Sequence, residues 1–201
     1  MQKLPPSFQR HPLDGVHCIH LGEFPKSLAQ DTEFFEELWR LHPAQFHEVQ
    51  MHGRRLKTPR WQQAYGRDYQ YSGSRNNSLP ISQLLEPHWQ WAKQTVDARL
   101  DGLLLNWYDG ARGHYIGRHR DSTRDMEHGA PILTLSFGQR RTFRMRPWKG
   151  RGYLDFEVGN GSALLIPYAT NLAWTHEVPA SKKLRGRRIS LTMRAFCPNV
   201  E

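Results

Sequence analysis

The chain has 201 residues, a length that fits a single domain. Its 28 Lys and Arg residues against 19 Asp and Glu give a formal net charge of +9, which predicts attraction to polyanions such as nucleic-acid backbones. No run of about 18 apolar residues occurs, and the N-terminal stretch MQKLPPSFQRHP lacks the apolar core of a signal peptide, so we expect no membrane span and a cytoplasmic location.

Two helices are expected in the first half of the chain. The first helix is expected over residues 31–41, with Asp31 as its N-cap. It carries apolar side chains at helical spacing and ends before Pro43. A second helix is expected from Pro87 to about Leu100. No repeat or long linker divides the chain, so residues 1–201 are expected to form one domain, in which residues 1–48 are a helical extension.

From residue 103 onward the pattern becomes that of short strands. Apolar and polar residues alternate over 133–137 and 154–158, and further strands are expected at 143–145, 163–166 and 189–193, with glycine in the turns between them. This favours a mainly β fold with flanking helices (α+β): a double-stranded β-helix, or jelly roll, over residues 103–196, with the helices packed on the outside of one sheet.

Three residues form a candidate metal site. His119 and Asp121 stand at i and i+2, which directs both side chains to one side of an extended segment, and His176 follows 57 positions later. The two cysteines, Cys18 and Cys197, lie far apart and cannot build a cysteine metal site. Two histidines and one carboxylate are the ligands used for oxygen-activating iron(II). The isolated pattern is also that of ordinary surface residues.

The strand at 188–194 has two contrasting faces. Ile189, Leu191 and Met193 share one face, and Arg188, Ser190, Thr192 and Arg194 share the other. The polar face could look into water, or into a cavity where two guanidiniums would bind the carboxylates of a short diacid. Asn106 and Tyr108 share a face of an earlier strand and could complete the hydrogen bonds of that diacid.

These segments, in this order, resemble the AlkB family of iron(II)- and 2-oxoglutarate-dependent dioxygenases over roughly residues 49–196. The resemblance rests on five segments: Asn-x-Tyr at 106–108, His-x-Asp at 119–121, GAPILTLSFG at 129–138, His176, and Arg188 through Arg194.

The resemblance implies oxidative demethylation of N-alkylated bases in DNA or RNA, as in the repair of alkylation damage, with release of formaldehyde, succinate and CO2. Its cofactors would be Fe(II), 2-oxoglutarate and O2. His119, Asp121 and His176 would hold the iron, and four residues would hold 2-oxoglutarate: Asn106, Tyr108, Arg188 and Arg194. It further implies a nucleic-acid partner and, for a repair enzyme, a nucleoid-associated or nuclear location. We expect the chain to act as a monomer.

The resemblance also implies a substrate lid over residues 49–80. Tyr69, Tyr71 and the ring of His119 are candidate surfaces for stacking an extruded base. Candidate contacts with phosphates are Arg54, Arg55, Lys57 and Arg60.

Two positions depart from the family pattern. Members that act on adenine or cytosine carry an acidic residue four positions after the first iron histidine, where this chain has Thr123. A threonine hydroxyl supplies no charge, so a cationic base would need Asp125 or Glu127 instead. Duplex-specific members insert a phenylalanine finger into the base stack, and Met51 and His52 stand at the matching place.

Two other functions use part of the same pattern. An oxygenase acting on a small molecule or a protein side chain would keep every iron and 2-oxoglutarate residue. A basic β-sandwich that only binds its partner would need none of them.

Overall fold

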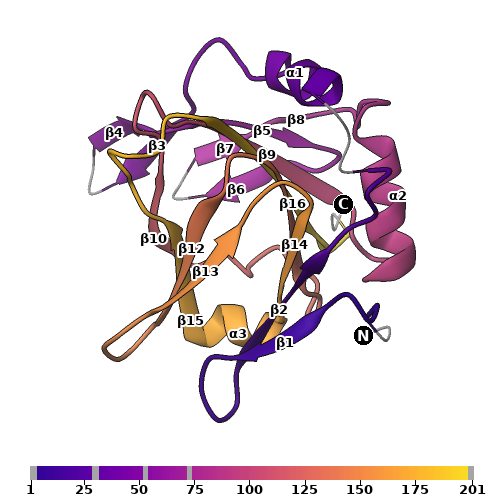
Figure 1. The fold of residues 1–201 in the computed structure, drawn as a ribbon, viewed down its shortest axis with the longest axis vertical. Coiled ribbons are helices and arrows are strands. Elements are labelled where there is room, and N and C mark those ends of the chain that lie inside the picture. Colours follow the sequence, from indigo (N-terminus) through magenta and orange to yellow (C-terminus); the bar gives the residue numbers. More distant parts are fainter. Residues whose placement is uncertain (1–3, 29–31, 52–53, 72–73, 199–201) are drawn as a thin grey trace.

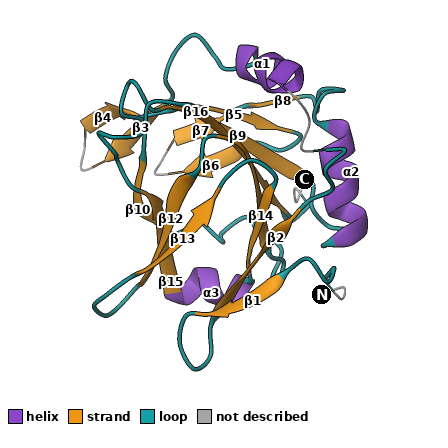
Figure 2. Cartoon of the chain, in the orientation of Figure 1, coloured by secondary structure: helices purple, strands orange, loops and turns teal. Residues whose placement is uncertain are grey.

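The protein is described by a computed structural model over residues 4–28, 32–51, 54–71 and 74–198. Two β-sheets face each other as a jelly roll, with two helices against the outer face of the larger sheet (Figures 1 and 2). The larger sheet runs in the order β1 (Gln9–Pro12), β2 (Cys18–Glu23), β14 (Ser162–Ile166), β11 (Ile132–Gly138), β16 (Arg187–Arg194), β9 (Gly102–Asp109), β5 (Trp61–Tyr65), β8 (Ser78–Leu79). The smaller sheet runs β10 (Ile116–His119), β15 (Trp174–Val178), β12 (Arg141–Pro147), β13 (Leu154–Val158). The fold class expected from the sequence is confirmed.

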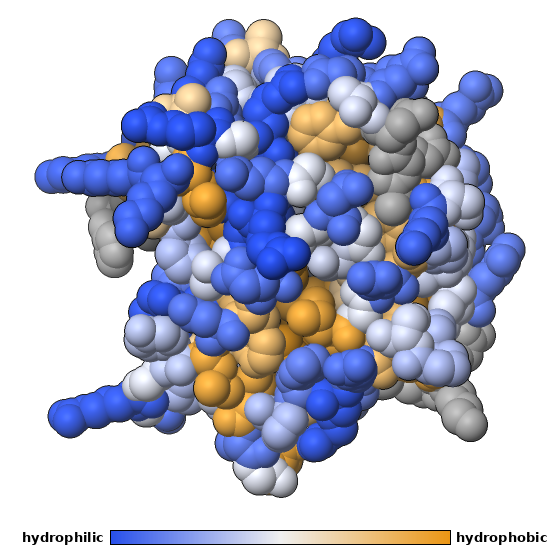
Figure 3. Space-filling view, in the orientation of Figure 1, coloured by the Kyte–Doolittle hydropathy of each residue, from blue (hydrophilic) through white to orange (hydrophobic). Residues whose placement is uncertain are grey.

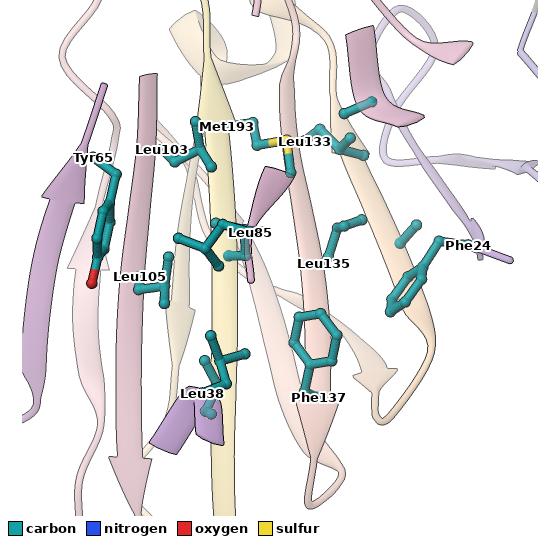
Figure 4. Packing of buried hydrophobic residues seen from close by; sticks show 14 of the residues in the cluster. Phe24, Leu38, Tyr65, Leu85, Leu103, Leu105, Leu133, Leu135, Phe137 and Met193 are labelled. Carbon is teal, nitrogen blue, oxygen red and sulfur yellow. The ribbon is translucent and has the colours of Figure 1, made fainter. Parts of the chain in front are cut away.

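Alternation along the central strands separates an apolar face from a polar one. In the antiparallel register Leu191 lies between Leu135 and Leu105, while Ser190 lies between Ser136 and Asn106. The apolar face forms the main core, shown in Figure 4 with Leu38 and Leu85 of the helical layer packed against it. The polar face therefore looks into the space between the sheets.

Helices α1 (Thr32–Arg40) and α2 (Glu86–Thr95) cover the apolar face, as expected. The indole nitrogen of Trp107 in β9 donates to the Leu38 carbonyl at 2.9 Å and fixes α1 to the sheet. Helix α2 ends earlier than expected, because the Asp97 carboxylate accepts the backbone N–H of Arg99 and forms a turn that replaces the next helical turn. A third, six-residue helix, α3 (Tyr168–Ala173), precedes β15.

The N-terminal segment differs from the helical extension that was expected. Besides α1 it contains β1 and β2, which pair with each other and extend the larger sheet beyond β14. Their sequences, QRHP and CIHLGE, carry no apolar alternation, because only Ile19 is buried in this edge pair.

Two hairpins stand over the polar side of the larger sheet, in the segment expected to be a lid. They are β3 (Glu48–Met51) with β4 (Arg54–Lys57), and β6 (Tyr69–Tyr71) with β7 (Ser74–Asn76). None of the described helices has the length and apolar character needed to cross a membrane.

Candidate active site

The folded chain brings together the three residues with metal-ligating side chains. His119 ends β10, His176 lies directly opposite it on β15, and Asp121 follows two residues after His119. The Asp121 carboxylate is 3.6 Å from His119 Nε2 and 3.9 Å from His176 Nε2, and one ligand atom from each residue lies within 4.8 Å of the others. Ligands of one ion, each about 2 Å from it, lie about 3 to 4 Å apart, and the distances from the Asp121 carboxylate to both histidines fall in that range.

Neighbouring groups orient both imidazoles. His119 Nδ1 is 2.9 Å from the Gly117 carbonyl, to which it donates when Nδ1 carries the proton, and this tautomer directs Nε2 to the carboxylate. The His176 ring stacks on Phe143, with centroids 5.3 Å apart. Burial, reinforced by neighbouring His119, lowers the pKa of His176 to about 3, so this ring is neutral near pH 7, as metal binding requires.

Asp121 is a buried carboxylate with a cationic partner. Arg194 donates to Asp121 Oδ2 from Nε at 3.0 Å and from Nη2 at 2.6 Å. Burial alone would raise the pKa of Asp121, but Arg194 and the two histidines hold it well below its usual value. Tyr69 closes the group, with its hydroxyl 3.5 Å from the same carboxylate and its ring beneath the Arg194 guanidinium. Asp121 is therefore ionised and ready to bind a cation.

Asn171 of α3 holds the backbone on which Asp121 stands. Its Oδ1 accepts the Asp121 N–H at 3.2 Å, and its Nδ2 donates to the Asp121 carbonyl at 3.0 Å. The side chain is 1% exposed, so the two bonds are shielded from water. Sequence reasoning missed this residue, because a lone asparagine in a short helix carries no recognisable spacing.

Arg188 lies deep in the same cavity and lacks an anionic partner. Its Nη2 donates to the Ser136 hydroxyl at 2.8 Å, while Nε and Nη1 have no hydrogen-bond partner within the described chain. Burial lowers the pKa of Arg188, opposed by Tyr108 and reinforced by Arg141, and no carboxylate among the described residues contributes. A buried cation with unused N–H donors has the chemistry of a carboxylate-binding site.

Strands β5 and β9 add further polar side chains to the cavity wall. Asn106 Oδ1 accepts a 2.7 Å hydrogen bond from Arg60 Nε, and Tyr108 lies beside Arg188. Gln62 lines the same wall, and no sequence pattern marked this residue. Arg60 is 6% exposed, so it belongs to the cavity wall and not to the phosphate-facing surface where it was expected.

The other lid residues are distributed differently. Tyr69 is buried in the cavity, and all four side chains of β4 are exposed, including Arg54, Arg55 and Lys57. Long hydrophilic side chains project from this edge of the molecule in Figure 3. His52 and the side chains of Met51 and Tyr71 lie outside the described structure.

Thr123 is half-buried in the loop after Asp121 and is not among the residues that line the cavity. The two acidic residues that follow it do not line the cavity either. Glu127 pairs with Arg99 at 3.5 Å, and Asp125 faces a separate groove beside Arg75 and Cys197.

Comparison with known proteins identifies the family. Residues 23–194 match the model described as the 2OG-Fe(II) oxygenase superfamily. Human DNA oxidative demethylase ALKBH2 is 30% identical over 203 residues, which span 94% of this chain and 77% of that protein. The chain belongs to the AlkB family.

This AlkB-family chain has two further relatives of note. Bovine DNA oxidative demethylase ALKBH2 is 29% identical over 94% of this chain and 72% of that protein. Rat alpha-ketoglutarate-dependent dioxygenase alkB homolog 3 is 30% identical over 56% of this chain and 44% of that protein. The solved structure of OsALKBH1 superposes with a TM-score of 0.56 at 16% identity, over 92% of this chain and 99% of that one, and supports the fold alone.

Membership makes the chain an Fe(II)- and 2-oxoglutarate-dependent dioxygenase that consumes O2. The cavity fits these groups on its own chemistry. The cluster of His119, Asp121 and His176 suits Fe(II), and the buried Arg188 with its unused donors suits a carboxylate of 2-oxoglutarate.

Proposed function

We propose that this AlkB-family chain removes methyl groups from N-alkylated bases of DNA or RNA. The observation that carries the proposal is the joint presence, in one cavity, of a two-histidine, one-carboxylate cluster and a buried guanidinium without an anion. Relatives named DNA oxidative demethylase support the choice of substrate. When bound, Fe(II), 2-oxoglutarate and O2 would supply the oxidation of the N-methyl group, which would leave as formaldehyde while 2-oxoglutarate is converted to succinate and CO2.

In this proposal the metal ligands, the two arginines and Asn106 have defined tasks. His119, Asp121 and His176 hold Fe(II). Arg188, with Ser136 and Tyr108 beside it, binds the carboxylate of 2-oxoglutarate that lies away from the metal. Arg194 sits next to the metal because it pairs with Asp121, and it orients the end of the diacid that approaches the iron. Asn106, held by Arg60, completes the polar wall.

The lid gives the cavity a route to nucleic acid. We infer that the exposed cations of β4 contact phosphates and that an extruded base enters beside Tyr69, whose hydroxyl lies 3.5 Å from the Asp121 carboxylate. Residues 49–80 then act as the lid of a single domain spanning residues 1–201, which acts as a monomer in the compartment that holds its nucleic acid.

Formaldehyde release tests the proposal. Iron-loaded protein would be given 2-oxoglutarate and oligonucleotides that carry one methylated base each: 1-methyladenine, 3-methylcytosine, 1-methylguanine or 3-methylthymine. We expect formaldehyde from at least one of them and none from the His119→Ala variant. Succinate without formaldehyde from every oligonucleotide would overturn the nucleic-acid substrate and point to a small molecule or a protein side chain.

A further inference from the structure

Gln62 is a buried polar residue of the cavity that no function described so far uses. It lies on β5 opposite Asn106 of β9, is 4% exposed and lines the cavity together with Arg60 and Tyr69. Its carboxamide takes part in none of the hydrogen bonds found within the described part of the chain. The carboxamide therefore lines the cavity with its N–H donors and its oxygen acceptor unused, and a ligand that enters the cavity can hydrogen-bond it.

The charges of the cavity restrict that ligand. Among the described residues that line it, Arg60, Arg188 and Arg194 are cationic, and Asp121 is the one carboxylate. Fe(II) and dianionic 2-oxoglutarate cancel each other, so the positive excess of the chain remains after both have bound. A cationic base would enter against this excess, whereas a neutral base would not.

Nearby acidic residues do not correct the imbalance. The position at which other family members carry an acid is Thr123, which does not line the cavity. Glu127 is engaged by Arg99 on the outside, and Asp125 faces the separate groove. The wall beside Tyr69 therefore offers the substrate a neutral carboxamide in place of a carboxylate.

We propose that Gln62 is a specificity-determining residue that selects neutral N-alkylated bases over cationic ones, the neutral bases being those with a carbonyl, and not an amino group, at position 4 of a pyrimidine or position 6 of a purine. This inference rests on the proposed demethylase function. The Nε2 group of Gln62 donates to that carbonyl. Because the carboxamide is neutral, it gives a cationic base no charge compensation in a cavity whose excess charge is already positive.

The bases 3-methylthymine and 3-methylcytosine provide a matched test. They share the pyrimidine ring and the methyl group on N3 but differ in charge, in the 5-methyl group that only thymine carries, and in the group at position 4, which is a carbonyl in the first and an amino group in the second. Binding of single-stranded oligonucleotides would be measured by fluorescence anisotropy without oxygen, with iron and 2-oxoglutarate bound, and formaldehyde release would be measured in air. We expect the wild-type protein to favour 3-methylthymine by at least about tenfold in both measurements.

The Gln62→Glu variant should move this ratio toward 3-methylcytosine by at least about tenfold, because a carboxylate repels the carbonyl and attracts the cation. The control is Gln63→Glu on the same strand, since the Gln63 amide donates to the Asn77 carbonyl at 2.9 Å and lies outside the cavity. This control should leave the ratio unchanged.

Equal or better use of 3-methylcytosine by the wild-type protein, or an unchanged ratio in Gln62→Glu, would overturn the role of Gln62 and leave the demethylase function intact. Failure to demethylate either base, or any other base of the panel above, would overturn both.

Discussion

At the residue scale, we expect Arg188 to bind a carboxylate of 2-oxoglutarate with its unused N–H donors. Replacing it with Met keeps a similar volume and removes the charge, so we expect the KM for 2-oxoglutarate to rise at least about tenfold through loss of charge-assisted hydrogen bonds. Because the guanidinium is buried without an anion, the ligand-free variant should melt no lower than the wild type. Initial rates of succinate formation, and melting with and without 2-oxoglutarate, measure both effects.

The matched control is Arg144→Met, because Arg144 pairs with Asp155 on the outer side of the smaller sheet. Its KM for 2-oxoglutarate should stay at the wild-type value. An unchanged KM in Arg188→Met would show that 2-oxoglutarate is bound elsewhere.

Asn171 acts on the metal site through the backbone of Asp121. Asn171→Ala leaves the N–H and carbonyl of Asp121 unpaired in a buried place, so we expect Fe(II) affinity to fall roughly tenfold or more, as for other groups that orient metal ligands. Anaerobic titration with Fe(II) measures it. Thr170→Val is the control, since the neighbouring Thr170 hydroxyl donates to the Cys18 carbonyl of β2 and does not touch Asp121. Equal metal affinity in the two variants would reduce Asn171 to a structural role.

The residues found from the sequence stand in spaced patterns, and the residues missed do not. His119 and Asp121 share parity, and Arg188 and Arg194 share the polar face of one alternating strand. Asn171 and Gln62 are single amides whose importance depends on which distant backbone or cavity they reach. That information comes only from the strand register and from the packing of α3.

At the element scale, amphipathic segments were predictable and edge segments were not. The strands around residues 133–137 and 189–193 bury an apolar face under the helices, which imposes strict alternation. The edge strands β1 and β2 bury little, so nothing in their composition had to alternate. The early end of α2 likewise depends on one side-chain hydrogen bond of Asp97.

The docking of α2 should make stability depend on pH. His88 of this helix is 1% exposed, and its Nε2 is 2.8 Å from the Leu28 carbonyl. Burial lowers the pKa of His88 below its ordinary value of 6.5. As the pH falls below 6.5, His88 is therefore protonated in the unfolded chain while it stays neutral in the folded chain. Stability is therefore full above pH 6.5 and declines below it.

Urea unfolding of metal-free protein at neutral and mildly acidic pH tests this account. His88→Gln can keep a hydrogen bond to Leu28 and removes the titrating group, so it should lose less stability on acidification than the wild type. Burial also lowers the pKa values of other histidines, His20, His47, His114 and His176, so the dependence should shrink and not vanish. Equal losses in variant and wild type would show that His88 does not contribute.

At the scale of the whole molecule, the net charge of +9 and the cations of β4 predict salt-dependent binding of nucleic acid. The affinity for a single-stranded oligonucleotide should fall steeply as the salt concentration rises. The double variant Arg54→Ala, Arg55→Ala should reduce the slope of log binding constant against log salt concentration by roughly 1 to 2, since each lost phosphate contact removes about 0.7. Anisotropy titrations at several salt concentrations measure the slope.

The paired control removes two exposed cations that lie outside the β3–β4 hairpin, Arg10 of β1 and Lys26. It changes the net charge equally but should leave the slope close to that of the wild type. The same slope change in both double variants would mean that net charge, and not the β4 hairpin, governs binding.

The central claim is that one cavity couples 2-oxoglutarate turnover to loss of a methyl group from a base. The most direct test is to follow 2-oxoglutarate consumption while the intact mass of a methylated oligonucleotide is recorded from the same reaction. We predict that each oligonucleotide loses the mass of one CH2 group for each 2-oxoglutarate consumed. Consumption of 2-oxoglutarate with every methylated oligonucleotide left unchanged in mass would contradict the account.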